Sequence, residues 1–317
     1  MDPLSDLFRV IRLSGGVFLD AVLSEPWCVS SRITEEDCGP NIGEIGAIIG
    51  FHFVLEGRML VQLAGGETRE VASDHLVLLP RNDPHVLASE PGLPPVSANH
   101  LVRRARDDAM AHIDYGDASR SRTRFVCGYV ASATRHHPLL EALPALLIMD
   151  VRGKPSADWV KSSFRFAAQE VAAGRPGAQT VLARLSELLF IEAVREHLER
   201  LPQSGTGWLA ALRDPALARS LSAIHGRVGE PWTADALAAE ARLSRSAFAE
   251  RFGQVLGQPP LTYLTRWRMQ IAARRLRDTQ HGIAAIAAEV GYESEATFSR
   301  AFKREMGIAP GRYRQQG

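Results

Sequence analysis

The chain has 317 residues, of which 45% are hydrophobic and 23% are charged, a composition typical of globular proteins that excludes bulk disorder. Its length leaves room for two domains, each with its own core. The N-terminal segment lacks the basic region and apolar run of a secretory signal, and no stretch is apolar enough to span a bilayer, so we expect a cytoplasmic protein with no membrane partner. Its three cysteines lack CxxC spacing, which argues against a disulfide framework or a zinc finger.

The formal net charge of +1 conceals an asymmetry along the chain. Residues 208–317 hold 16 Lys and Arg against 10 Asp and Glu, a charge of +6, whereas residues 1–207 hold 21 against 26, a charge of −5. A basic segment behind an acidic one indicates nucleic acid as the partner of the basic part, although a merely solvated basic face would give the same count.

Residues 51–89 carry the pattern of short β-strands. Runs of Val, Leu and Phe are broken at Gly57, at the Gly65-Gly66 turn, and at Pro80 and Pro84. This spacing is typical of an antiparallel sandwich or barrel, and strand-length runs at 41–50 and 124–130 extend it.

Residues 89–122 interrupt the strand pattern. They are rich in Pro, Ser, Asp and Arg and show little periodicity. Because a loop of this length is unusual inside a compact domain, we expect a lid or, in preference to it, local disorder.

From about residue 136 the apolar residues take helical spacing. The last of these helices, within 177–201, has an apolar stripe and a charged opposite side, so it must bury one face. The stripe packs either on the preceding barrel or on a second copy of the chain, and consists of Leu182, Leu185, Leu189 and Val194. Residues 202–207, PQSGTG, are the predicted linker, which separates a domain at 1–201 from one at 208–317.

The last third of the chain contains an internal repeat. Residues 237–240 match residues 286–289 at an offset of 49, whereas the residues that follow match at an offset of 50. The second unit therefore has one extra residue, near Glu293. An insertion between two matching helical patterns belongs in a turn, so each unit is predicted to be a helix, a short turn and a second helix. At an offset of 50, six pairs are identical: Ser244/Ser294, Phe248/Phe298, Phe252/Phe302, Gly257/Gly307, Pro260/Pro310 and Tyr263/Tyr313.

Each second helix is predicted to bury one face and to present the other. Thr233 can cap the first helix of the first unit, and Ser244 and Ser294 can cap the second helices. Side chains on the first turns of such helices reach base edges in a major groove. The presented residues are Arg245, Ser246, Ala249 and Glu250 in the first unit and Glu295, Ala296, Ser299, Arg300 and Lys303 in the second.

A helix over 260–278 is predicted to join the two units. At ~1.5 Å per residue it spans roughly 27 Å, which suits two recognition helices set in successive major grooves. Some of its arginines should contact phosphates and the others should be solvated or paired.

Residues 208–317 resemble the DNA-binding domain of AraC/XylS-type transcription regulators, through the strings WTADALAAEARLSRSAFAERF, YLTRWRMQIAARRL and IAAIAAEVGYESEATFSRAFKREMGIAPGRYR. The resemblance implies base contacts at the positions of Ser246, Ala249 and Glu250 and of Glu295, Ala296 and Arg300. Arg300 suits guanine, and the two alanines can make only apolar contacts, for example with a thymine methyl. Glu250 either accepts from a cytosine amino group or holds a neighbouring arginine.

The first part of the chain resembles the cupin sensor domain that precedes this DNA-binding domain, through FHFVLEG, DHLVLLPRNDPHVL and CGYV. Cupin metal sites imply an H-x-H pair, but Val54 stands where the second histidine belongs, which argues against an oxygenase-like centre. His52, Glu56 and His85 remain candidates for a divalent metal or a polar ligand, or are satisfied polar groups at a barrel mouth. Cys127, with Cys28, is a candidate for redox sensing, against the simpler interpretation of a core residue.

We therefore predict an α+β protein of two domains, a cupin-like β-barrel with trailing helices followed by an all-α double helix-turn-helix. The predicted function is sequence-specific regulation of transcription on double-stranded promoter DNA, by a homodimer that responds to a small-molecule or redox effector and contacts RNA polymerase if it activates. The alternative is a cupin-type metal-dependent enzyme fused to a DNA-binding domain.

Overall fold

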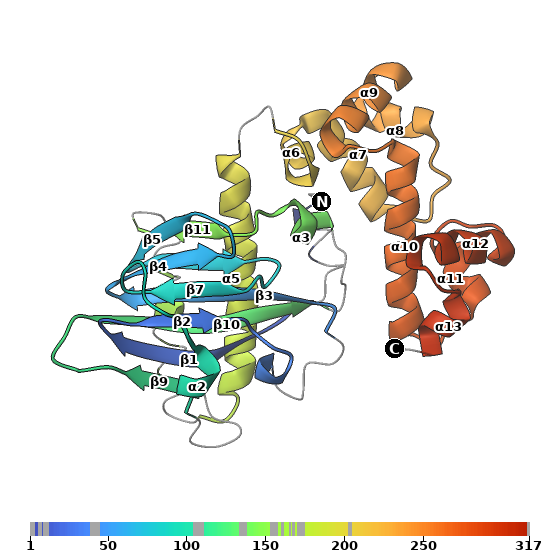
Figure 1. The fold of residues 1–317 in the computed structure, drawn as a ribbon. Helices are drawn as coiled ribbons and strands as arrows, with labels where there is room; N and C mark the ends of the chain where they lie inside the picture. Colours follow the sequence, from blue (N-terminus) through green and yellow to red (C-terminus); the bar gives the residue numbers. More distant parts are fainter. Residues whose placement is uncertain are drawn as a thin grey trace. The chain divides into compact units, whose positions relative to one another are not determined.

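The computed structural model describes residues 13–38, 45–103, 111–132, 138–152, 175–201 and 205–315, with a few further positions between 4 and 8 and between 158 and 169 (Figure 1). The chain divides into two units, one comprising Arg12–Glu196 and the other built on His197–Gly317. A search of the described helices finds none long and apolar enough to cross a bilayer.

The first unit contains two facing β-sheets. The six-stranded sheet has the order β11-β6-β3-β10-β1-β9, and the five-stranded sheet has the order β5-β4-β7-β2-β8 (Figure 1). The strands are β1 (Leu13–Ser24), β2 (Cys28–Ser31), β3 (Ala47–Glu56), β4 (Arg58–Leu63), β5 (Thr68–Ala72), β6 (His75–Leu79), β7 (His85–Ala88), β8 (Val96–Ser97), β9 (Ala111–Tyr115), β10 (Arg122–Ser132) and β11 (Leu147–Asp150).

One apolar core joins the two sheets. Leu23 and Phe125 of the larger sheet share a buried cluster with Val61 and Leu87 of the smaller one. Alternation along each strand turns these residues inward, as the period-two pattern predicts. The β architecture is confirmed, but the two sheets form a sandwich and not the closed barrel that we predicted.

Residues 89–122 are not simply a lid or a disordered segment. They contain β8, the short helix α2 (Ala98–Leu101) and β9. β8 pairs in parallel with β2, and β9 pairs in parallel with β1, so both sheets gain an edge strand from this segment. Backbone pairing at a sheet edge fixes strands whose own sequence shows little periodicity. Residues 104–110 lie outside the described part.

The helical pattern from about residue 136 is correct only in part. Pro138–Ala142 forms the short helix α3, as the helical spacing predicts, but Leu147–Asp150 forms β11, which pairs with β6. A further short helix, η1 (Glu36–Cys38), lies earlier in the unit. The apolar run in β11 is too short for its period to distinguish a strand from a helix, and the free edge of β6 decides between them.

Helix α5 (Ala178–Arg200) buries its predicted stripe within its own unit. Leu182, Leu189 and Val194 are at most 3% exposed, whereas Leu185 is half-buried. A Cβ placed on Gly15 of β1 would lie 2.6 Å from the Cβ of Ser186, so the helix lies directly against this strand. Of the two predicted alternatives, the structure therefore supports packing of the apolar stripe on the chain's own sheet.

The described part of the second unit is helical (Figure 1). Asp214 accepts hydrogen bonds from the backbone N–H groups of Ala216 and Leu217 and caps α7, whose first residue is Pro215. The helices are α6 (Trp208–Arg213), α7 (Pro215–Gly226), α8 (Ala234–Ala241), α9 (Arg245–Leu256), α10 (Pro260–Asp278), α11 (Ile283–Glu289), α12 (Glu295–Met306) and α13 (Pro310–Gln315).

The repeat folds as two helix-turn-helix units, α8–α9 and α11–α12. Thr233 Oγ1 accepts from Ala236 N at 3.1 Å, and Ser244 Oγ accepts from Ala247 N at 3.3 Å, so both predicted caps of the first unit form. Ser294 Oγ lies 3.5 Å from Thr297 N in the second unit. The repeated phenylalanines, Phe248, Phe252, Phe298 and Phe302, are fully buried.

The loop that leads into the first helix-turn-helix unit, between α7 and α8, contacts the second unit closely beside α10. A Cβ added to Gly291, in the turn between α11 and α12, would lie 2.7 Å from the Gly229 carbonyl oxygen. The Arg268 guanidinium of α10 donates to the carbonyls of Val228 and Glu230 on one side and of Gly291 on the other. This junction, formed by Arg268, Gly229 and Gly291, fixes one unit against the other.

Candidate functional site

The proposed recognition surface lies on the outer faces of α9 and α12. Both helices begin at a serine N-cap and bury their phenylalanines, so their remaining side chains turn away from the core. Of the nine residues that we predicted to face DNA, Ser299 is half-buried and the other eight are exposed: Arg245, Ser246, Ala249, Glu250, Glu295, Ala296, Arg300 and Lys303.

The cations on the two helices differ in their partners. Arg245 Nη1 lies 3.3 Å from the Asp235 carboxylate of α8, and both side chains are mostly exposed. Arg300 reaches only the hydroxyl of Thr297, at 3.4 Å, and makes no ion pair within the described residues. The second helix therefore presents a guanidinium that no carboxylate among the described residues neutralises.

Glu250 holds Gln254 rather than an arginine. Its Oε1 accepts a hydrogen bond from Gln254 Nε2 at 3.0 Å, one turn along α9. The other predicted partner, a cytosine amino group, would have to compete with this exposed amide.

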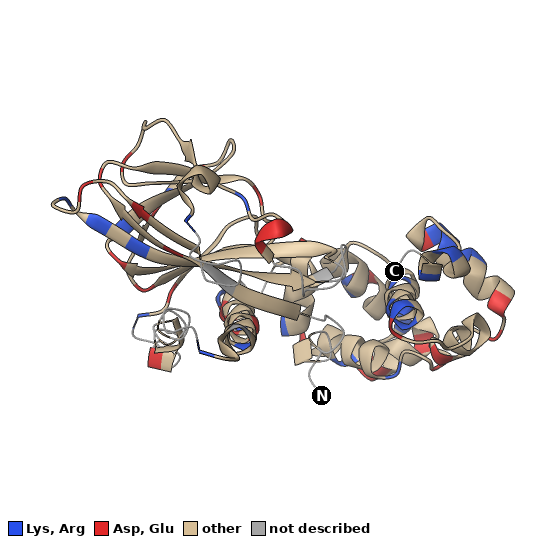
Figure 2. Cartoon of the chain, turned by 90° about the horizontal axis from the view of Figure 1, so that it is seen from below, with Lys and Arg blue, Asp and Glu red and all other residues tan. Residues whose placement is uncertain are grey.

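The arginines of α10 contribute mainly to structure. Arg274 and Arg275 pair with Asp278 and Glu289, at 3.2 and 3.3 Å. Burial of Arg268 in the junction lowers the pKa of its guanidinium from the ordinary value. Sequence patterning did not reveal this role, because a guanidinium that bonds to backbone carbonyls leaves no signal in residue spacing. Figure 2 shows Lys and Arg gathered on the helices beside the C-terminus, where Arg312 is also exposed.

In the first unit, three buried side chains form a hydrogen-bonded chain between the two sheets. His52 Nδ1 lies 2.9 Å from Cys127 Sγ, and His52 Nε2 lies 2.7 Å from His85 Nε2. His85 Nδ1 faces the Asp83 carbonyl at 3.0 Å. We call this set the Cys-His-His chain: Cys127, His52 and His85.

One arrangement of protons satisfies every contact of the Cys-His-His chain. A carbonyl only accepts, so neutral His85 carries its proton on Nδ1 and offers a bare Nε2. His52 then donates from Nε2, and its bare Nδ1 accepts the Cys127 thiol proton. Burial lowers the pKa of both histidines, and the neighbouring imidazole of His85 adds to this effect on His52.

The predicted metal ligands do not converge on one point. His52 and His85 meet, but Glu56 lies four residues along β3, about 13 Å away at ~3.3 Å per residue, and is exposed. No group of three or more His, Cys, Asp or Glu that could hold a metal ion occurs among the described residues. The histidine nitrogens are occupied by one another, by Cys127 and by Asp83, so these residues do not fit a divalent metal.

The two candidate redox cysteines are buried in different sheets. Cys127 lies on β10 and Cys28 on β2, and both are free thiols. Burial raises the pKa of the Cys127 thiol well above its ordinary value, and Asp20 and Asp37 add to the effect. Burial also raises the pKa of Cys28. A raised pKa opposes the thiolate form on which oxidation depends.

Comparisons with known proteins match both units of the chain. A family model described as Cupin matches residues 2–199, and one described as Helix-turn-helix domain matches residues 237–316. An AraC-like transcription regulator of Streptomyces lividans is 33% identical over 99% of this chain and 98% of its own length. The HTH-type transcriptional regulator AlkR of Acinetobacter baylyi is 31% identical over the whole of both chains.

Among solved structures, the DNA-binding domain of AdpA in complex with a target DNA is 29% identical, covers 32% of this chain and 92% of that chain, and has a TM-score of 0.31. The names of the full-length relatives support a regulator and give no support to the fused enzyme. The chain belongs to the AraC-type transcription regulators, with a cupin domain in front of a helix-turn-helix domain.

Proposed function

We propose that this regulator recognises double-stranded promoter DNA with α9 and α12 together. The observation that carries the proposal is the pair of N-capped helices with buried phenylalanines and exposed first turns. Arg300 reads a guanine, because it is exposed and pairs with no carboxylate in the described part of the chain. Ala249 and Ala296 contact apolar base edges such as thymine methyls.

The remaining exposed residues position the helices or read single bases. Lys303 and Arg245 lie on the outer faces and suit phosphates or guanines. Ser246, Ser299 and Glu295 suit contacts through short hydrogen bonds, and Glu250 suits a cytosine amino group. Helix α10, with 19 residues, spans about 28 Å at ~1.5 Å per residue, which supports the use of two successive grooves.

The domain roles follow from this assignment. Residues 1–201 act as the sensor and dimerisation domain, 202–207 as the linker, and 208–317 as the DNA-binding domain. Val181 and Leu188 of α5 are 40% and 49% exposed and lie seven residues apart on one face, which supports a homodimer through this helix. A dimer would present four recognition helices and raise the apparent affinity through effective concentration.

The first unit senses the signal, and the activated dimer contacts RNA polymerase where it activates. A small-molecule effector agrees better with the Cys-His-His chain than a thiol signal does, since burial keeps Cys127 protonated. Exposure of DNA-bound protein to hypochlorite tests the redox hypothesis. A response that persists in Cys127→Ser would exclude Cys127 as the sensor.

DNase footprinting on the promoter region of its own gene tests the proposal. We expect protection over about two helical turns per subunit, with an affinity that falls steeply between 50 and 200 mM salt, as about 6–10 phosphate contacts require. Equal affinity for promoter and random DNA would exclude a sequence-specific regulator.

A further inference from the structure

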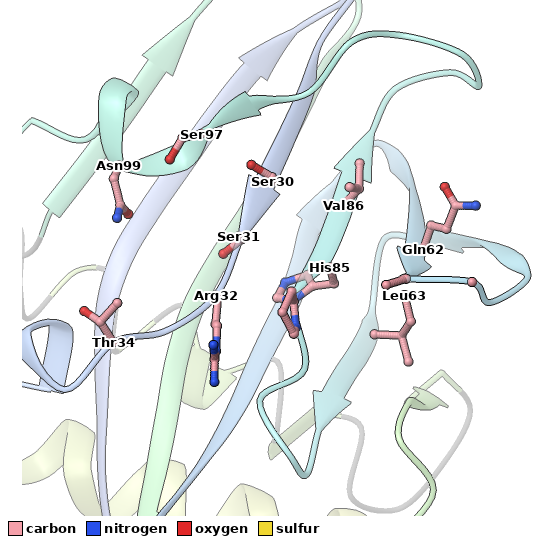
Figure 3. Close-up of a pocket in the computed structure, with 13 residues that line it drawn as sticks. Ser30, Ser31, Arg32, Thr34, Gln62, Leu63, His85, Val86, Ser97 and Asn99 are labelled. Carbon is pink, nitrogen blue, oxygen red and sulfur yellow. The ribbon is translucent and has the colours of Figure 1, made fainter.

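A cavity of about 530 Å³ opens where β2, β4 and β7 end in the first unit (Figure 3). Strand register brings Ser31 opposite His85, and His85 opposite Leu63, on the smaller sheet. Ser30 lies opposite Ser97 of β8 in the same sheet. Strand ends that are distant in the sequence therefore supply one wall of mainly polar side chains.

Several polar groups on this wall have no hydrogen-bond partner within the described part of the chain. The side chains of Ser30, Ser31 and Asn99 make no such bond, although each lines the cavity. Ser97 occupies the N-cap position of α2, yet its hydroxyl makes no capping bond. These groups are available to hydrogen-bond a ligand that carries hydroxyls.

Arg32 supplies the charge of the cavity. It is exposed and makes no ion pair or hydrogen bond with any described residue, whereas Arg58 and Arg69 of the same unit pair with glutamates. Among the described lining residues, none is Asp or Glu. The Asp37 carboxylate, five residues along the chain from Arg32, accepts hydrogen bonds from the backbone N–H and the hydroxyl of Thr34.

We infer that this cavity binds a small hydroxylated oxyanion, a sugar acid or a sugar phosphate, with Arg32 on the anionic group and the serine hydroxyls on the ligand hydroxyls. The inference rests on the proposed function, in which the first unit senses an effector, and names the chemistry of that effector. The planar guanidinium matches carboxylate and phosphate oxygens in paired hydrogen bonds. The volume lies within the roughly 300–1,000 Å³ of small-molecule sites.

The cavity communicates with the opposite sheet through His85. Figure 3 shows His85 in the wall, between Val86 and Leu63 on one side and Arg32 on the other. Its Nε2 bonds to His52 of β3, which in turn bonds to Cys127 of β10. An occupant that contacts His85 is therefore one hydrogen bond from the larger sheet.

Calorimetric titration of the full-length protein at constant ionic strength tests the inference with two anions and their neutral counterparts. D-gluconate is compared with sorbitol, and glycerol 3-phosphate is compared with glycerol. We expect saturable binding of at least one anion and none of either neutral polyol. The anion that binds distinguishes a sugar acid from a sugar phosphate.

Arg32→Gln is expected to weaken anion binding about 10-fold or more, since it removes the charge-assisted contact and leaves a neutral polar side chain. Arg69→Gln, an exposed arginine outside the cavity, is the control and should bind as wild type. Absence of anion binding, or Arg32→Gln binding as tightly as wild type, would overturn the inference. DNA footprinting of the same preparations separates the two proposals, because anion binding without promoter binding would refute only the proposed function.

Discussion

Replacement of Tyr263 by Phe removes one hydroxyl from the centre of the second unit. Tyr263 Oη accepts from Trp208 Nε1 at 2.9 Å and lies 2.7 Å from His225 Nε2. Trp208, His225 and Tyr263 are all at least 91% buried. The change removes the hydroxyl to which both buried groups, Trp208 Nε1 and His225 Nε2, are bonded, at about 1–3 kcal/mol each, so we expect a loss of about 2–6 kcal/mol in the free energy of unfolding.

Hydrogen exchange of the backbone amides in α6 and α7 measures this loss in the full-length protein, where a single unfolding transition is not expected for two domains. A loss of about 2–6 kcal/mol corresponds to roughly 30- to 20,000-fold faster exchange. Tyr313→Phe is the matched control, because Tyr313 holds the same place in the second repeat but is half-buried. A loss below about 0.5 kcal/mol in Tyr263→Phe, or an equal loss in the control, would refute the reasoning.

Three further outcomes are expected. Arg300→Ala should cost about 1–3 kcal/mol of promoter binding and relax base preference at one position, as measured by binding to a set of DNA sites that differ by single bases. Uniform weakening across the set would instead indicate a phosphate contact. Gly128→Ala should destabilise the first unit by more than about 1 kcal/mol in urea unfolding, because its Cβ would lie 2.1 Å from Phe51 Cζ; unchanged stability would show that the sheet relaxes. Burial lowers the pKa of His52 and His85 below the ordinary 6.5, so the unfolded chain binds more protons and the free energy of unfolding should fall as the pH drops below 6.5. A free energy of unfolding that stays constant between pH 7.5 and 5 would contradict their burial as neutral groups.

The helical domain was predictable because its signals are local. A cap, a run of Phe at i and i+4, and a turn residue define each helix within a dozen positions, and the repeat supplies every signal twice. Ser244 and Phe248 therefore stand where the sequence places them. The residues that we propose to face DNA follow from the buried face, since they occupy its opposite side.

The sensor domain was less predictable because its contacts are non-local. β11 takes its structure from the edge of β6, some 70 residues earlier in the chain, and no local pattern reports such pairing. The link between His52 and Cys127 likewise depends on the β3–β10 register, which sets the two residues opposite each other. Glu56 was grouped with the histidines through the resemblance to cupin metal sites, and strand geometry separates it from them.

The junction at Arg268 and the glycine pair bears on the architecture of the promoter. A flexible spacer would let the two readers adjust to half-sites at several separations, as tethered modules do. The close approach of Gly229 and Gly291 removes that freedom, so the distance and the helical phase between α9 and α12 become a fixed property of the protein. Insertion of one or two base pairs between the half-sites should then impair recognition as severely as mutation of a contacted base, and operators of this regulator should share a single spacing.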